Sequence, residues 1–126
     1  MAASSATWHE AVEKLKPGTP DIHRAVVSLM EELEAIDWYR QRADACDDEQ
    51  LRAILEHNMN EEIEHASMVL EWLRRHVPKI DAALKTYLFT SGDVTKLEDV
   101  VTEGGAPAQK DEQRHPRTTI GDLKER

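Results

Sequence analysis

Apolar residues recur at helical spacing along two long segments of the chain. In residues 20–45, the positions that share one helix face are mostly apolar: Ala25, Leu29, Glu32, Ile36, Tyr39 and Ala43. In residues 49–76, the corresponding positions are Leu51, Leu55, Asn58, Glu62, His65, Val69 and Trp72. Because a spacing of three and four residues places side chains on one face of an α-helix, each segment is expected to form a long amphipathic helix. We call these two faces the seams.

Start and stop signals support both helices. Thr19 is the expected N-cap of the first helix, with Pro20 at the first helical position. The acidic stretch Asp47–Glu49 provides the start of the second helix, and Pro78 stops it. Because the connection is so short, the two helices are expected to fold back on each other as an antiparallel hairpin.

Shorter elements flank the hairpin. Trp8, Val12 and Leu15 fit a short amphipathic helix of about three turns near the N-terminus. A third helix is expected over residues 78–89, and Gly92 closes it. The sequence therefore predicts an all-α fold, built from an antiparallel two-helix hairpin plus short helices.

The chain divides into three parts by composition. Residues 1–92 are expected to form the helical domain. Residues 93–117 are interpreted as a flexible linker, because most of this stretch has almost nothing apolar. Residues 118–126 form a tail in which two aliphatic residues, Ile120 and Leu123, reappear around a glycine.

Length and composition limit the classes of protein that fit. At 126 residues the chain has room for one domain, and no run approaches the roughly 20 apolar residues of a transmembrane helix. The N-terminus lacks the pattern of a signal peptide, so we expect a cytoplasmic protein without a membrane partner. The net charge of −9 argues against nucleic-acid binding and favours attraction of cations. The single Cys46 cannot form an intramolecular disulfide.

Ionisable groups interrupt both seams near their middles. Glu32 stands on the first seam, and Glu62 and His65, three residues apart, project side by side from the second. A carboxylate on a packing face costs free energy unless it is paired, hydrogen-bonded or bound to a metal. Carboxylate oxygen and imidazole nitrogen suit iron, manganese or zinc, although an ion pair is the alternative. Ferritin-like dimetal proteins use a Glu from each of two helices and Glu-x-x-His from each of two others, and this chain holds half of that set.

Half a ligand set implies a second copy. A hairpin of two helices cannot bury both seams, and the third helix is too short and carries no Glu-x-x-His. Two copies related by a two-fold axis would complete a ferritin-like four-helix bundle and bring together both sets of Glu32, Glu62 and His65. Their four carboxylates would balance the charge of two divalent cations. We therefore expect a homodimer in which the bundle forms only on dimerisation and is coupled to metal binding.

Six short motifs run through roughly residues 22–90. They are His23-Arg24-Ala25, Met30-Glu31-Glu32-Leu33-Glu34-Ala35, Asp37-Trp38-Tyr39, Glu61-Glu62-x-Glu64-His65-Ala66, Leu70-Glu71-Trp72-Leu73-Arg74-Arg75 and Thr86-Tyr87-Leu88-Phe89-Thr90. Together they resemble the encapsulated ferritins, the ferritin-like ferroxidases carried as cargo inside encapsulin shells. The tail segment Thr119-Ile120-Gly121-Asp122-Leu123 is similar to the cargo-loading peptides that bind the inner face of the shell.

The resemblance implies a diiron ferroxidase that oxidises Fe(II) to Fe(III) for iron storage. It implies that Glu32, Glu62 and His65 form a diiron centre with two Fe per dimer interface, and that Tyr39 lies close to that centre. It also implies that dimers assemble further into an open ring, which in this family is expected to be a decamer.

The resemblance assigns further sites outside the diiron centre. Glu31 and Glu34 match acidic positions at which iron is attracted and enters, and Trp38 matches the aromatic residue beside them. Ile120 and Leu123 are the expected anchors on the encapsulin shell. The protein would then work in the cytoplasm inside an encapsulin nanocompartment, with the helical domain as the half-ferritin ferroxidase and the tail as the cargo-loading peptide.

Two other functions remain open at this point. One is another ferritin-like dimetal enzyme, manganese catalase-like or peroxidase-like, which metal content and the consumption of oxygen or peroxide would distinguish. The other is a non-catalytic helical cargo or adaptor protein, which would not oxidise Fe(II). His57 and Glu61 could also ligate a metal, but no partner is evident, so we interpret them as a surface pair.

Overall fold

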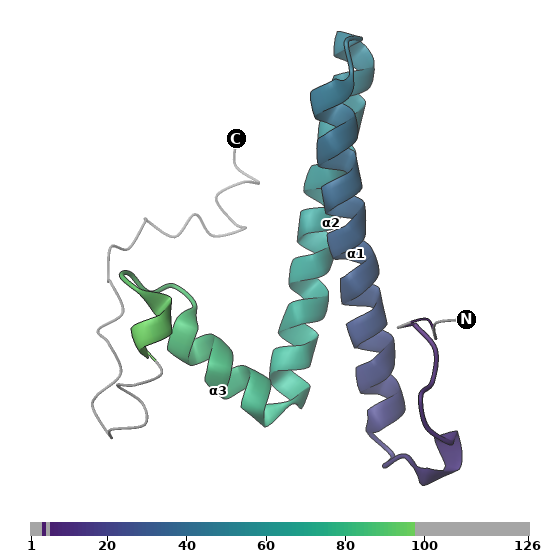
Figure 1. The fold of residues 1–126 in the computed structure, drawn as a ribbon, viewed down its shortest axis with the longest axis vertical. Helices are drawn as coiled ribbons and strands as arrows, with labels where there is room; N and C mark the ends of the chain where they lie inside the picture. The colour runs from purple at the N-terminus through teal and green to yellow at the C-terminus, as the bar shows by residue number, and fades with distance from the viewer. Residues whose placement is uncertain (1–3, 5, 98–126) are drawn as a thin grey trace, which may run out of the picture. The chain divides into compact units, whose positions relative to one another are not determined.

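The structure is a computed structural model that describes residue 4 and residues 6–97. In chain order the elements are a short 3₁₀ helix, η1 (Val12–Lys14), and three α-helices, α1 (Thr19–Ala45), α2 (Glu49–His76) and α3 (Pro78–Tyr87) (Figure 1). No β-strand occurs in the described residues. The all-α prediction is confirmed. The chain separates into two compact units, Met1–Asp81 and Ala82–Arg126.

The hairpin of α1 and α2 dominates the first unit. Asp48 is the N-cap of α2, and its Oδ1 accepts a hydrogen bond from the Leu51 backbone N–H at 2.7 Å. The Arg52 guanidinium donates from Nε to the Cys46 carbonyl at 3.0 Å, which ties the connection to the first turn of α2. These two contacts close the turn, and α1 and α2 then pack along their lengths in opposite directions, as predicted (Figure 1).

The start of α1 differs from the prediction by one residue. Thr19 was expected to be the N-cap, but Gly18 holds that position and Thr19 is the first helical residue. The reason lies in the backbone hydrogen bonds: the Thr19 N–H donates to the Lys16 carbonyl, and the first helical bond runs from the Ile22 N–H to the Gly18 carbonyl. The Thr19 side chain therefore makes no cap, and Pro20 still lies in the first turn.

The N-terminal segment does not form the predicted three-turn helix. Only Val12–Lys14 are helical, as one 3₁₀ turn. The Trp8 ring lies against the His23 ring with centroids 4.3 Å apart, and His23 Nε2 lies 3.2 Å from the Ala6 carbonyl oxygen. A tertiary contact to α1 has replaced the helical arrangement that the local pattern favoured.

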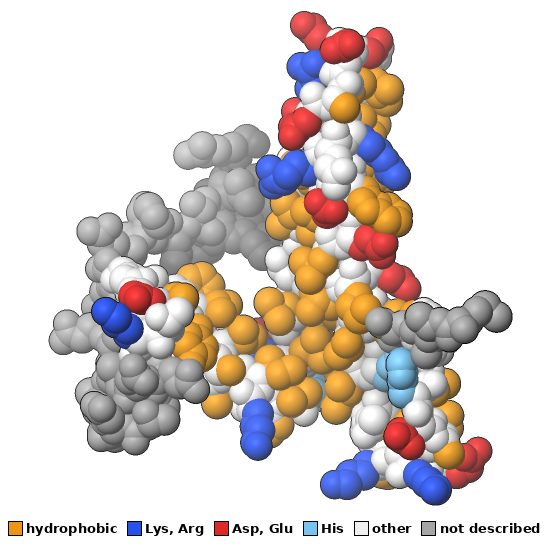
Figure 2. All heavy atoms as spheres, viewed as in Figure 1, with side chains coloured by type: hydrophobic (Ala, Val, Ile, Leu, Met, Phe, Trp, Pro, Cys, Tyr) orange, Lys and Arg blue, Asp and Glu red, His pale blue; other side chains and the backbone are white. Residues whose placement is uncertain are grey.

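The hairpin shields few side chains from solvent. Among the described residues of the first unit, the buried hydrophobic side chains are Ala43, Ala66 and Leu73. Many larger apolar side chains remain exposed, and Figure 2 shows apolar groups spread over the hairpin; they include Val26, Met30, Leu33, Ile54, Ile63 and Met68. Exposed apolar surface of this extent is typical of a chain that packs against a partner.

Charged side chains hold the end of α2 to the first turn of α3. Arg74 forms ion pairs with Glu71 and with Asp81, and Arg75 also pairs with Glu71 at 2.8 Å. The Arg74 and Arg75 guanidinium groups lower the pKa of Glu71 to about 2. The predicted stop of α2 before Pro78 is confirmed, and Val77 is its C-cap.

The helix α3 continues from the first unit into the second and ends earlier than predicted. The helix was expected to reach Phe89, but it ends at Tyr87. Phe89 has φ of 58°, in the left-handed region that interrupts a helix, and Gly92 follows with φ of 85°. Residues 94–97 are again helical. The rest of the predicted linker and the whole predicted tail, with Ile120 and Leu123, lie outside the described residues.

Candidate metal centre

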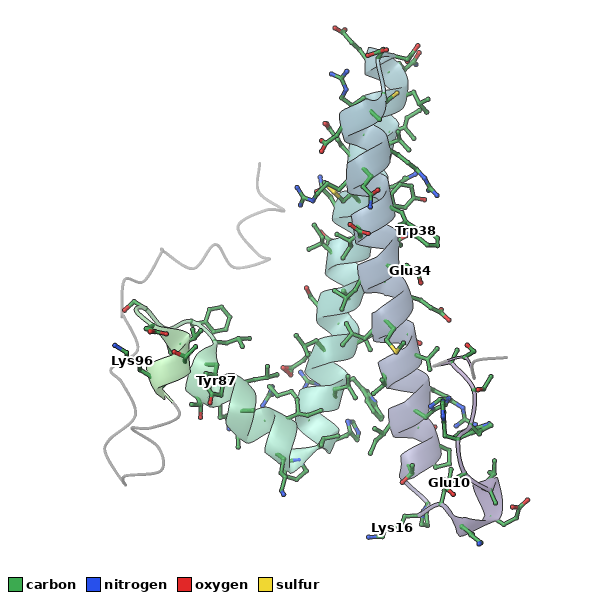
Figure 3. The ribbon with its side chains drawn as sticks, in the orientation of Figure 1. Glu10, Lys16, Glu34, Trp38, Tyr87 and Lys96 are labelled. Atoms are coloured by element: carbon green, nitrogen blue, oxygen red, sulfur yellow. The ribbon has the colours of Figure 1, made fainter. Side chains whose placement is uncertain are left out.

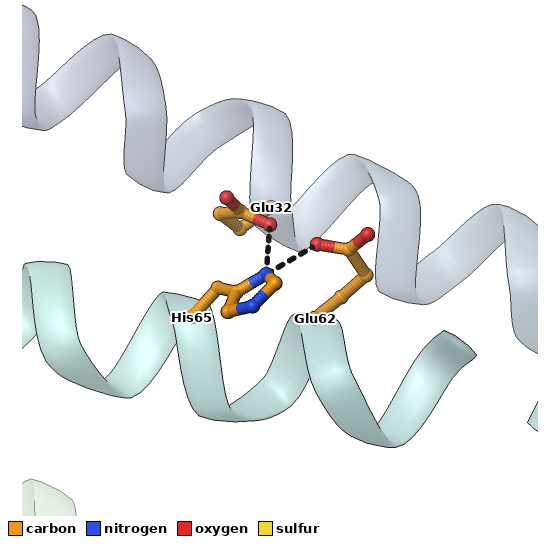
Figure 4. Close-up of side chains that lie close together, drawn as sticks. All are labelled: Glu32, Glu62 and His65. Carbon is orange, nitrogen blue, oxygen red and sulfur yellow. Dashed lines mark hydrogen bonds and ion pairs between the residues drawn. The ribbon is translucent and has the colours of Figure 1, made fainter. Parts of the chain in front are cut away.

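Three predicted ligands meet between the two long helices. Glu32 projects from α1, and Glu62 and His65 project from successive turns of α2 toward it (Figure 4). His65 Nδ1 lies 3.2 Å from Glu62 Oε2 and 3.7 Å from Glu32 Oε2. One donor atom from each residue lies within 4.8 Å of the others. We call Glu32, Glu62 and His65 the three-residue cluster.

The periodicity of the seams places these side chains. On α1, every seam position predicted from the sequence is at least partly shielded, and on α2 every one except Leu51 is. Because α1 and α2 run in opposite directions, the middle of one seam meets the middle of the other. Glu32 therefore faces Glu62 and His65 rather than solvent.

The cluster is only partly covered by its own chain. The exposed fraction of the side chain is 25% for Glu32, 24% for Glu62 and 44% for His65. A cation could therefore reach the carboxylate oxygens and the imidazole without local unfolding. Solvent also weakens the attraction between these charges, so the cluster is a weak contributor to the stability of the single chain.

The three groups perturb one another's proton affinity. Hydrogen bonding with Glu62, together with partial burial, raises the pKa of Glu32. Hydrogen bonding with Glu32 and with His65 lowers the pKa of Glu62. Hydrogen bonding with Glu62 raises the pKa of His65. Because their carboxylates lie close together, Glu32 and Glu62 favour sharing a proton when no metal cation is bound. A bound cation would replace that proton.

The donor set is of a kind that a divalent transition metal accepts. Two carboxylate oxygens and one imidazole nitrogen are the mixed ligands that iron, manganese and zinc accept. Within the described part of the chain, no fourth His, Cys, Asp or Glu joins the cluster. Three protein donors leave coordination positions open, which water, substrate or a second copy of the chain would fill.

The residues predicted to attract iron are not part of the cluster, although the charge of Glu31 contributes to the raised pKa of Glu32. Glu31 and Glu34 are exposed on α1, and neither belongs to the cluster. Trp38, 48% exposed, projects from α1 one turn after Glu34 (Figure 3). The structure thus provides an exposed acidic and aromatic surface, and a role for it in metal uptake stays a prediction.

Tyr39 is half-buried on the seam of α1, two turns after Glu32. The Arg42 guanidinium carbon lies 5.5 Å from the centroid of the Tyr39 ring and 5.9 Å from that of Trp38. Arg42 was not among the predicted site residues, although its spacing of three and four residues from the two aromatic residues is a signal for such contacts.

The remaining pair singled out in the sequence is a surface pair. His57 Nε2 lies 3.6 Å from Glu61 Oε1, and both side chains are largely exposed. The described residues supply no third ligand to this pair.

A shallow, open groove lies on the seam between the first turns of α1 and the later turns of α2. Its volume is about 530 Å³, and its lining residues are Asp21, Arg24, Ala25, Ser28, Met68, Val69 and Trp72. Three of these, Ala25, Val69 and Trp72, are seam positions. One hairpin therefore leaves this part of its seam unfilled.

The antiparallel helices and the carboxylate and imidazole cluster define a ferritin-like helical protein. The EncFtn-like family model matches residues 7–91. The chain belongs to the EncFtn-like family, which confirms the resemblance found in the sequence. None of the helices in the described residues is long and apolar enough to cross a bilayer.

Relatives of the chain extend over most of its length. It is 53% identical over 120 residues to an encapsulated ferritin-like protein of Rhodospirillum rubrum, covering 88% of this chain and 86% of the relative. It is 34% identical over 123 residues to the encapsulin nanocompartment cargo protein EncC of Myxococcus xanthus, covering 93% and 95%. A crystal structure of a protein from Nitrosomonas europaea matches with a TM-score of 0.66 and 53% identity, covering 68% of this chain and 94% of that one.

Proposed function

We propose that this protein is a ferroxidase that takes Fe(II) as its substrate and oxidises it to Fe(III). The observation that carries the proposal is the meeting of Glu32, Glu62 and His65 from two helices, with donor atoms within 4.8 Å. The family adds support, because one relative is named an encapsulated ferritin-like protein.

The side chains of the cluster have separate tasks in this proposal. Iron supplies the redox chemistry, with each Fe(II) giving one electron to oxygen or peroxide. Glu32 and Glu62 supply negative charge that binds the cation and compensates the charge gained on oxidation. His65 supplies a neutral nitrogen ligand once its proton has left. Tyr39 flanks the centre from the next turns of α1.

A complete centre needs two copies of the chain. Two copies related by a two-fold axis would bring together both clusters, so that about four negative charges face two divalent cations. The exposed apolar residues and the unfilled groove on the seam support such a partner. We propose that iron enters past Glu31, Glu34 and Trp38, and that the dimers assemble further into a decameric ring.

Storage of the product needs an enclosing compartment, because a ring of helices encloses no large cavity. We propose that residues 1–92 act as the ferroxidase domain, that residues 93–117 form a linker, and that residues 118–126 bind an encapsulin shell through Ile120 and Leu123. The name of the Myxococcus relative, a cargo protein of an encapsulin nanocompartment, supports this assignment. The protein would then oxidise iron in the cytoplasm, inside the shell.

Anaerobic titration with Fe(II), followed by exposure to oxygen, tests the proposal. We expect saturation at two Fe(II) per pair of chains and oxygen-dependent formation of Fe(III). Glu62→Gln should abolish most of this activity, because a dimer would lose two ligand carboxylates at once. Glu56→Gln is the matched control, because Glu56 is an exposed glutamate of the same helix outside the cluster.

Three results would count against the proposal. Full activity in Glu62→Gln would refute the site. Tight binding of manganese with turnover of peroxide, and without Fe(II) oxidation, would favour another dimetal enzyme. Absence of any redox-metal binding would favour a non-catalytic cargo or adaptor protein.

A further inference from the structure

One arginine lies between two aromatic side chains that belong to different faces of α1. The Arg42 guanidinium lies 5.5 Å from the Tyr39 ring centroid and 5.9 Å from the Trp38 ring centroid. A helix turns by about 100° per residue, so Arg42 lies about 40° from Trp38 and about 60° from Tyr39, between the two. Both distances are within the range at which a cation is attracted to the face of an aromatic ring.

The two rings mark two different environments. Trp38 is 48% exposed and projects one turn after Glu34, on the acidic outer surface of α1 (Figure 3). Tyr39 is half-buried on the seam, in line with Glu32. A single planar cation thus joins the outer surface of the helix to the face that carries the three-residue cluster.

We propose that Arg42 is a positioning residue for the delivery of Fe(II): it holds the Trp38 and Tyr39 rings as one unit between the acidic surface and the cluster. This inference rests on the proposed ferroxidase function. Within the described residues, Arg42 is not a member of the three-residue cluster. Its effect passes through the two rings, which lie between Glu34 and Glu32 in angle about the helix axis.

The shape of the side chain makes the proposal specific. A planar guanidinium can lie against two rings at once, whereas a lysine ammonium is a compact charge that favours one ring. Loss of one exposed contact of this kind corresponds to about a two- to fivefold change in an equilibrium. Arg42→Lys should therefore weaken the unit, and Arg42→Gln should weaken it further. Arg40→Gln is the matched control, because Arg40 is an exposed arginine of the same helix that projects away from both rings.

The first measurement is spectroscopic and needs no iron. The full chain is labelled with 5-fluorotryptophan, which gives one ¹⁹F resonance for each of its three tryptophans, and Trp38→Phe assigns the resonance of Trp38. We expect Arg42→Lys and Arg42→Gln to shift or broaden the Trp38 resonance, and Arg40→Gln to leave it unchanged. An unchanged Trp38 resonance in Arg42→Gln would overturn the proposal.

The second measurement separates delivery from binding and chemistry. In Arg42→Gln we expect the KM for Fe(II) to rise about two- to fivefold, with kcat and the anaerobic affinity for Zn(II) unchanged. A lower KM would overturn the proposal, because it would show that Arg42 acts only by repelling cations. An unchanged KM in an active enzyme would overturn the role in delivery. Absence of Fe(II) oxidation in the unsubstituted chain would instead refute the proposed function itself.

Discussion

Metal should control the association of the chain, and the size of the effect follows from the cluster. Each chain supplies three donors, so a two-fold pair supplies six donors for two cations, and a single hairpin offers only half of a centre. A ligand that binds the assembled form alone, at about 100 times its dissociation constant, stabilises that form by about 2.7 kcal/mol per site. Two such sites would tighten the pairing of chains by roughly 10⁴-fold.

Zn(II) is a suitable probe for this effect because it binds the same donors without redox chemistry. Sedimentation velocity over a range of chain concentrations gives the dissociation constant of the dimer with Zn(II) and with a chelator. Glu62→Gln should lose most of the Zn(II) effect, and Glu56→Gln should keep it. The metal-free Glu62→Gln dimer should be at least as stable as that of the unsubstituted chain, because two like charges are removed from the interface.

The same dimer dissociation constant with Zn(II) and with chelator would refute the coupling of metal binding to association. That result would mean that the apolar seams alone hold the chains together. A Zn(II) effect of equal size in Glu62→Gln would also contradict it, since the metal would then bind elsewhere.

Three further predictions concern single features of the chain. The pKa of His65 is raised by Glu62, so protons should compete with Zn(II) at a higher pH than for an ordinary histidine; affinity should fall as pH decreases through that range, and His65→Gln should flatten the calorimetric pH profile. Leu73 is only 3% exposed, so Leu73→Ala should cost about 2–5 kcal/mol in urea unfolding, and a loss below the error of the fit would show that its pocket collapses freely. Ile120→Asp with Leu123→Asp should leave Fe(II) oxidation intact but keep the protein out of co-expressed encapsulin particles. Normal loading of this double variant would show that another part of the chain binds the shell.

The cluster could be predicted because two independent constraints agree in the sequence. Seam periodicity gives the face on which Glu32, Glu62 and His65 lie, and the cost of a charge on that face requires a counterpart. The short connection then fixes which part of one seam meets the other. The cluster in the structure follows from these local rules.

Other features depend on contacts that local rules cannot provide. The predicted N-terminal helix was wrong because Trp8 packs against His23, fifteen positions further along the chain. The predicted end of α3 was wrong because Phe89 adopts a left-handed backbone conformation, which is rare for phenylalanine and could not be predicted from the residue type. Arg42 was not predicted because the candidate residues found by helical spacing were chosen from the seam, and Arg42 lies beside the seam.

The thin interior of the hairpin has a consequence for the supply of the protein in the cell. In the described residues of the first unit, the buried apolar side chains are Ala43, Ala66 and Leu73. Burial of so little apolar surface contributes little to the folding stability of a single chain. Newly made chains without a partner should be cleaved readily by proteases. Local opening of such a chain exposes little additional apolar surface, so its free-energy cost is small. If pairing protects the chain, its lifetime rises with its own abundance. The steady-state amount of the protein would then rise more than in proportion to its rate of synthesis, so that a modest rise in expression would produce a large rise in abundance.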